Sequence, residues 1–149
     1  MAKANPVMNK ESQSGPKRRF FTLAEARRAL PLVRRIALDI QTIQARRAAL
    51  HARLAVESIP LPAEEMAQAQ KELDRATGRL EELAEELFKI GVELKDPARV
   101  LLDFPALHEG REILLCWKSD EATISHWHEV DSGFAGRRPV ELLEDHRGA

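Results

Sequence analysis

The chain has 149 residues, of which 44% are hydrophobic and 32% charged, with a formal net charge of −1 and one cysteine, Cys116. That length can bury a hydrophobic core without a disulfide or a structural metal, and a single cysteine excludes an internal disulfide. The near-zero net charge gives no overall attraction to nucleic acid or to a membrane surface, and no apolar run approaches the roughly 20 residues of a membrane span. We therefore expect one soluble, cytoplasmic domain.

The two ends of the chain differ in composition from its centre. Residues 1–19 mix polar residues with Gly and Pro and finish in a basic triplet, without the apolar core of a signal peptide. We expect this stretch to be a disordered basic tail. Residues 140–149 are rich in charged side chains and are expected to form a second, charged tail. The single domain is then predicted over residues 20–140.

Two amphipathic helices are predicted to form an antiparallel hairpin over residues 22–90. Thr22 and Glu25 have the spacing of a capping box, which marks the start of the first helix. Pro31 predicts a kink or a short leading helix, and Gly91 is a natural end for the second helix. The second helix carries a heptad seam made of Met66, Ala69, Leu73, Ala76, Leu80, Leu83, Leu87 and Ile90.

Charge is divided between the two helices. Residues 22–57 hold seven arginines against three acidic residues, a net of +4, and residues 62–90 hold eight acidic against four basic residues, a net of −4. A basic helix lying antiparallel to an acidic one is electrostatically favourable. This pairing explains the arginines better than a phosphate-binding face does.

After Gly91 the apolar period shortens toward two, which predicts strands. Segments 99–104, 111–118 and 123–130 read as strands, and 92–95 as an edge strand, with turns at 107–110 and 119–122. Short turns between consecutive strands favour an antiparallel sheet over residues 92–131. The predicted fold class is α+β: a long antiparallel two-helix hairpin followed by a small antiparallel β-sheet of three to four strands.

Two histidines on the last predicted strand are the first candidates for chemistry. Side chains alternate along a strand, so His126 and His128 point to the same face. Two imidazoles on one face can share a divalent metal such as zinc, which needs further ligands to complete its shell. The candidate metal ligands are His126, His128, Asp103, Glu129 and Asp131.

A structural role for the same histidines is the alternative. A turn centred on residues 120–121 would place His126 opposite Leu115. His128 would then lie opposite Ile113. Because both neighbours are apolar, histidines on that face would be hydrogen-bonded core residues.

A Gly- and Arg-rich loop is predicted over residues 132–139, and its arginines suit a carboxylate or a phosphate. Cys116, in the middle of a strand, is interpreted as a small buried side chain rather than a nucleophile. No motif identifies catalytic residues or an organic cofactor. The candidates for an anion or a partner are Arg137, Arg138, Trp117 and Trp127.

Several short motifs follow one another in order between about residues 20 and 140. They are Phe21-Thr22-Leu23, Glu25-Ala26, Leu30-Pro31, residues 91–96, residues 103–106, residues 110–112, residues 114–117 and Trp127-His128-Glu129 with the following Asp131 and residues 133–137. Together they resemble the bacterial family catalogued as domain of unknown function 2203. The resemblance implies a small bacterial cytosolic protein and points to Asp103, Trp117, His128, Asp131 and Arg137.

His126 departs from that family pattern, in which an arginine- or tyrosine-like residue is expected at its position. A pair made of His126 and His128 is therefore not implied as the shared site of the family. A site that uses His128 with Asp103, Glu129 or Asp131 is compatible with the pattern.

Three functional hypotheses follow from these features. The leading one is a self-associating or partner-binding module, a homodimer through the helical hairpin, with a small polar His/Asp/Arg site on the sheet. The second is a metal-dependent hydrolase or metal-binding protein that uses His128 and nearby carboxylates. The third is nucleic-acid binding through the arginine-rich first helix, by Arg27, Arg28, Arg34, Arg35, Arg46 and Arg47.

Overall fold

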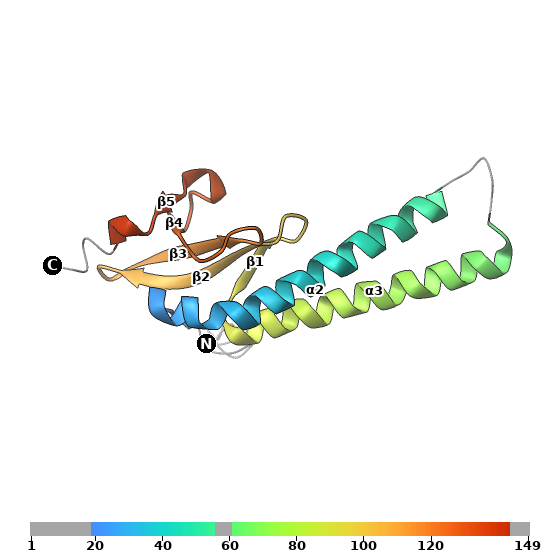
Figure 1. The fold of residues 1–149 in the computed structure, drawn as a ribbon, viewed down its shortest axis with the longest axis horizontal. Helices are drawn as coiled ribbons and strands as arrows, with labels where there is room; N and C mark the ends of the chain where they lie inside the picture. Colours follow the sequence, from blue (N-terminus) through green and yellow to red (C-terminus); the bar gives the residue numbers. More distant parts are fainter. Residues whose placement is uncertain (1–18, 56–60, 144–149) are drawn as a thin grey trace, which may run out of the picture.

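The computed structural model describes residues 19–55 and 61–143 and consists of a long helical hairpin that leads into an antiparallel sheet (Figure 1). The elements are α2 (Leu23–Ala55), α3 (Ala63–Ile90), β1 (Glu93–Asp96), β2 (Leu101–His108), β3 (Arg111–Lys118), β4 (His126–Glu129), the 3₁₀ turn η1 (Phe134–Gly136) and β5 (Arg138–Pro139). The predicted α+β class is confirmed. Most of the expected N-terminal tail, and residues 144–149 of the C-terminal one, lie outside the described residues.

The first helix begins where the sequence predicts. The Thr22 N–H donates to Glu25 Oε1 at 2.9 Å, and the Glu25 N–H donates to Thr22 Oγ1 at 3.0 Å, which confirms the capping box. A separate leading helix does not form, because α2 runs as one helix of 33 residues with Pro31 inside it. The buried residues Leu30 and Val33 anchor the chain on both sides of this proline.

The second helix ends at Gly91, which adopts a left-handed conformation with φ of 100°. Its N–H donates to the carbonyls of Leu87 and Phe88, as in common helix C-caps. A side chain at Gly91 would also crowd Arg19 and Phe21. The chain therefore turns sharply here into the sheet.

The sheet has five strands in the order β1-β2-β3-β4-β5, and every neighbouring pair is antiparallel. The fifth strand falls in the segment expected to be a Gly/Arg loop. It has only two residues, paired with His126 and Trp127. An alternating pattern cannot be recognised in so short a segment, so the sequence did not predict this strand.

One face of the sheet packs against the hairpin and forms the main core. Alternate residues of the central strands contribute to it, namely Leu102, Phe104, Ala106, Ile113, Leu115, Trp117 and Trp127. The hairpin contributes Val33, Ile36, Ile40, Leu83 and Leu87. The residues between them on each strand must point to the opposite face.

The predicted register between the third and fourth strands was wrong by one residue. His126 lies opposite Cys116, not Leu115, and His128 lies opposite Leu114, not Ile113. The loop is longer than a tight turn and is centred on Glu121, whose carboxylate accepts the Lys118 N–H at 2.9 Å. A slip of one residue exchanges the two faces of a strand, so the histidines belong to the face away from the helices.

The outer half of the hairpin extends beyond the sheet (Figure 1). There the helices contact each other through a small cluster of Leu50, Ala69 and Leu73, with Leu54 beside it. Arg46 pairs with Glu72 at 2.7 Å across the two helices. In the part of the chain that the structure describes, no helix is both long and apolar enough to cross a membrane.

Candidate metal centre

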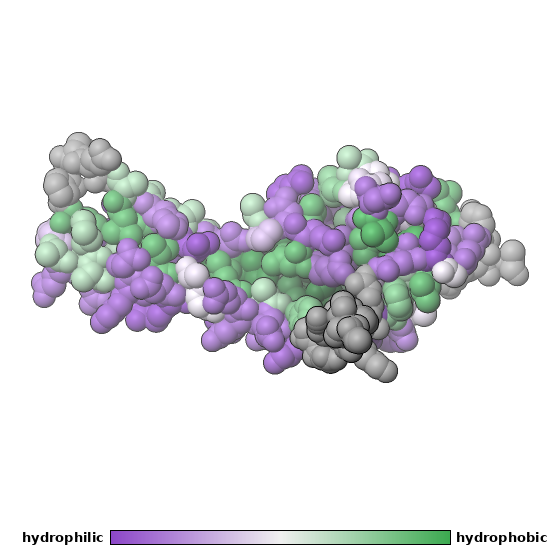
Figure 2. Space-filling model, turned by 180° about the vertical axis from the view of Figure 1, so that it is seen from behind, coloured by the Kyte–Doolittle hydropathy of each residue, from purple (hydrophilic) through white to green (hydrophobic). Residues whose placement is uncertain are grey.

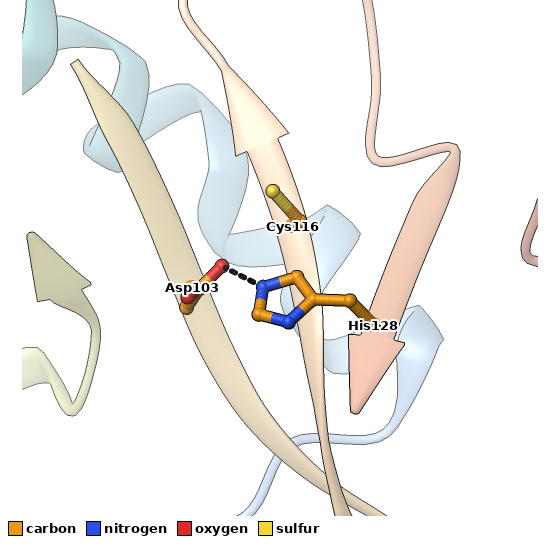
Figure 3. Close-up of side chains that lie close together, drawn as sticks. All are labelled: Asp103, Cys116 and His128. Atoms are coloured by element: carbon orange, nitrogen blue, oxygen red, sulfur yellow. Dashed lines mark hydrogen bonds and ion pairs between the residues drawn. The ribbon is translucent and has the colours of Figure 1, made fainter. Parts of the chain in front are cut away.

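Three buried polar side chains meet on the outer face of the sheet, one from each of three neighbouring strands (Figure 3). Asp103 comes from β2, Cys116 from β3 and His128 from β4, and none is more than 3% exposed. One ligand atom from each residue lies within 4.8 Å of those of the other two. A carboxylate, a thiol and an imidazole are thus concentrated in one small volume.

Strand register explains why these three residues meet. The turn between β2 and β3 consists of Glu109 and Gly110, with φ values of 55° and 78°, typical of a two-residue hairpin turn. This turn sets Asp103 directly opposite Cys116. His128 lies two residue pairs further along the ladder, opposite Leu114, and its ring reaches diagonally back to Asp103.

The His128 ring is held by hydrogen bonds at both nitrogens. Nδ1 lies 2.7 Å from the Glu129 carbonyl oxygen, which can only accept, so Nδ1 carries a hydrogen. Nε2 lies 3.2 Å from Asp103 Oδ1. Both ring nitrogens therefore have an oxygen partner, which fixes the orientation of the ring.

Burial controls the protonation of the other two groups. It raises the pKa of the Asp103 carboxyl, against the opposing effect of the neighbouring His128. Burial also raises the pKa of the Cys116 thiol to about 12, and the charge of Asp103 adds to this effect. Without a metal, Cys116 is therefore a neutral thiol and a poor nucleophile.

A small cavity of about 110 Å³ adjoins the cluster. All three polar residues line it, together with Lys95, Leu101, Val130, Gly133 and Phe134. Two guanidinium groups lie near the Phe134 ring, that of Arg137 4.7 Å and that of Arg99 5.1 Å from its centre. The cluster thus opens onto a pocket with one basic and several apolar walls.

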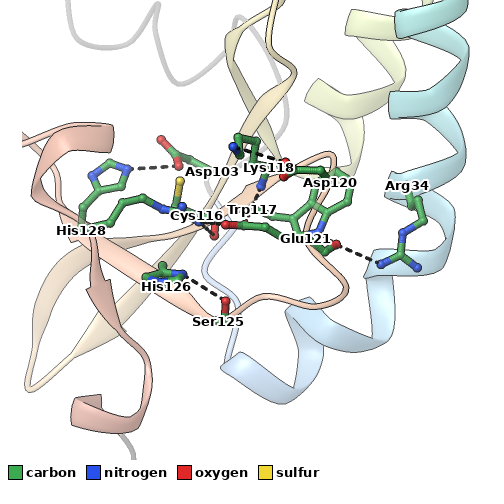
Figure 4. A network of polar contacts seen from close by, with 11 residues as sticks. Arg34, Asp103, Cys116, Trp117, Lys118, Asp120, Glu121, Ser125, His126 and His128 are labelled. Carbon is green, nitrogen blue, oxygen red and sulfur yellow. Dashed lines mark hydrogen bonds and ion pairs between the residues drawn. The ribbon is translucent and has the colours of Figure 1, made fainter.

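The structure brings together two of the five candidate metal ligands, Asp103 and His128. His126 lies on the same face, but its Nδ1 is bonded to Ser125 Oγ at 3.0 Å (Figure 4). Glu129 receives two bonds from Arg111, at 2.9 and 3.0 Å, and Asp131 is exposed. Sequence reasoning missed Cys116 as a member, because the wrong register placed it opposite neither histidine.

The candidate anion-binding residues are largely engaged in internal contacts. Arg137 donates to Glu121 Oε1 at 2.7 Å and to the Cys116 carbonyl at 3.3 Å. The Trp117 Nε1–H donates to the Glu121 carbonyl at 2.9 Å (Figure 4). Trp127 is buried in the core, with the exposed Arg138 over its ring at 5.2 Å.

Several arginines of the first helix also have partners within the chain. Arg27 donates to the Ile124 carbonyl and Arg34 to the Ala122 carbonyl, at 2.9 and 2.6 Å. These contacts fix the loop before β4 against α2. Together with the pairing of Arg46 and Glu72, these contacts engage part of the positive charge that a phosphate-binding face would need.

The fold and the cluster define a class of α+β protein, with a helical hairpin on one face of a five-stranded antiparallel sheet and a buried Asp–Cys–His cluster on the other. A family model described as an uncharacterized conserved protein, DUF2203, matches residues 19–140. The chain belongs to this family, as its motifs predicted. Comparison with curated proteins and with solved structures found no match.

Proposed function

We propose that the protein binds a divalent transition metal, zinc by its donor set, through Asp103, Cys116 and His128. The observation that carries the proposal is the approach of the three buried ligand atoms to within 4.8 Å of one another. Oxygen, sulfur and nitrogen are the donors that zinc takes from proteins. Ligand atoms around a zinc ion lie about 3–4 Å apart, so side-chain shifts of about 1 Å would close the site.

The orientation of His128 also favours a metal. Histidines that bind metals commonly donate their other ring N–H to a carbonyl or a carboxylate, which fixes the ring. Nδ1 makes this bond with Glu129, and Nε2 points at the carboxylate of Asp103. A cation would lie between these two side chains. A cytoplasmic location, which the cysteine content predicts, would keep Cys116 reduced.

Metal content tests this proposal directly. After dialysis against zinc and removal of free ion, the untagged protein is expected to hold about one zinc per chain by elemental mass spectrometry. His128→Ala and Cys116→Ala are each expected to hold less than about a tenth of that amount, because each removes one of three ligands.

His126→Ala is the matched control, since it removes an imidazole from the same strand and the same face. It should keep its zinc. Zinc retained by His128→Ala and lost from His126→Ala would contradict the assignment, as would wild-type protein without zinc after loading.

The hairpin favours a second function, self-association into a homodimer. In its outer half the described residues of the two helices pack against each other around the small cluster of Leu50, Ala69 and Leu73, and Figure 2 shows apolar surface along the hairpin between hydrophilic edges. A second copy that lays its acidic α3 along the basic α2 would cover this surface in a four-helix arrangement. Charge complementarity between the two helices supports a second copy as the occupant.

Sedimentation equilibrium at tens of micromolar, about the range in which weak interfaces form, is expected to give twice the chain mass of 16.8 kDa. Leu38→Glu and Phe88→Glu, at exposed apolar positions of α2 and α3, should shift the protein toward monomer. Leu107→Glu, at an equally exposed position on β2, serves as the control and should not. A monomer at every concentration would eliminate the homodimer.

A further inference from the structure

Beyond the three polar residues of the cluster, the cavity beside it is lined mainly by apolar side chains. Leu101, Val130 and Phe134 form apolar walls, and Lys95 supplies one positive charge. The Lys95 side chain is half exposed, and its Nζ lies 3.3 Å from Glu93 Oε1. Because an ammonium group has three N–H donors, it can bond Glu93 and still offer hydrogens to another group.

A zinc ion held by three protein ligands has one tetrahedral position left for water or another ligand. All three proposed ligands line the cavity, so that position faces the cavity rather than the protein interior. This arrangement is typical of zinc sites that exchange a ligand and unlike closed structural sites, which use four protein ligands.

We infer that this open position binds a small aliphatic carboxylate, of the size of acetate or propanoate, with its carboxylate on the metal and its alkyl group against Phe134, Val130 and Leu101. The inference rests on the proposed metal site and names the ligand class that this site takes.

Size and charge both lead to this class. A cavity of about 110 Å³ has the volume of roughly three or four waters, which suits a ligand of a few non-hydrogen atoms. The carboxylate of Asp103 and the thiolate of Cys116 would neutralise the metal, and Lys95 then favours a single negative charge on the ligand. A doubly charged, strongly hydrated anion such as phosphate would lose hydration against the apolar walls.

Cobalt-substituted protein gives a direct test, because the visible spectrum of Co²⁺ reports a change of ligand. Titration with acetate or propanoate is expected to change the spectrum in a saturable way, at lower concentrations than inorganic phosphate. Lys95→Met should weaken carboxylate binding about fivefold, the size of a partly exposed charge contact. Lys71→Met, which removes the same charge from exposed α3 surface, is the control and should leave the affinity unchanged.

A second variant tests the apolar wall. Phe134→Ala should weaken propanoate more than acetate, because the longer alkyl chain loses more contact. If the spectrum of cobalt-loaded protein does not change with either carboxylate, the inference is wrong but the metal site is still supported. Tighter binding of phosphate than of either carboxylate would lead to the same conclusion. Equal affinities in Lys95→Met and Lys71→Met would also overturn the inference. Absence of bound cobalt would instead refute the metal site itself, and the inference with it.

Discussion

Asp103→Ala is expected to lower the free energy of unfolding by about 3–5 kcal/mol, the usual cost of removing one partner from a buried pair. The change leaves His128 Nε2 without its partner on a side chain that is almost fully buried. Water cannot easily replace the carboxylate there, so the imidazole loses a hydrogen bond and gains no solvation. Urea denaturation at neutral pH, with a chelator present to keep the protein free of metal, measures the loss.

The double variant Asp103→Leu with His128→Leu distinguishes the cost of breaking the pair from the cost of removing both polar groups. Replacing both partners by apolar side chains of similar volume costs far less than breaking the pair, and in some proteins stabilises the fold. The double variant is therefore expected to be more stable than Asp103→Ala. If the unfolding free energy of Asp103→Ala lies within about 0.5 kcal/mol of the wild-type value, the range of a typical surface substitution, the hydrogen bond between Asp103 and His128 does not contribute as the geometry implies.

The helical hairpin could be predicted from the sequence because its signals are local. A heptad pattern such as Leu73, Leu80 and Leu87 identifies a buried seam without knowledge of the partner. The capping box at Thr22 and the glycine at Gly91 mark helix ends through residues a few positions apart. None of these signals depends on the prediction made for another segment of the chain.

Prediction of the cluster of Asp103, Cys116 and His128 needed the register between strands, which local sequence signals do not give. Cys116 meets Asp103 and His128 only if the β3–β4 loop has its observed centre, and an error of one residue turns the histidines toward the wrong face. His126 and His128 share a face, and the sequence could not tell them apart. The diagonal position of Asp103 on a third strand selects His128, and that relation exists only in the folded sheet.

Metal-free protein is expected to lose about 4 kcal/mol of stability between about pH 9 and pH 12 through Cys116 alone, since about three pKa units separate the folded and unfolded thiol. The folded pKa is raised, so the neutral thiol stabilises the fold. This contribution is complete below pH 9 and is lost as pH rises through the folded value of about 12.

Cys116→Ala isolates that contribution. The chain contains no tyrosine, so lysines are the main other groups that titrate in this range, and they are the same in both proteins. The difference in unfolding free energy between wild type and Cys116→Ala should therefore shrink as pH rises. A difference that stays constant from pH 8 to pH 11 would show that the thiol is not held neutral by burial.

Zinc should abolish the same pH dependence. A thiol bound to zinc is already deprotonated, so the stoichiometrically loaded protein has no buried Cys116 proton to lose. Between pH 9 and 10 the metal-free protein is expected to lose about 1 kcal/mol through this group, and the zinc-loaded protein close to none. The comparison reports on the sulfur atom alone. An unchanged alkaline slope in zinc-loaded protein would place the ion elsewhere and remove Cys116 from the ligand set, even if the metal content were stoichiometric.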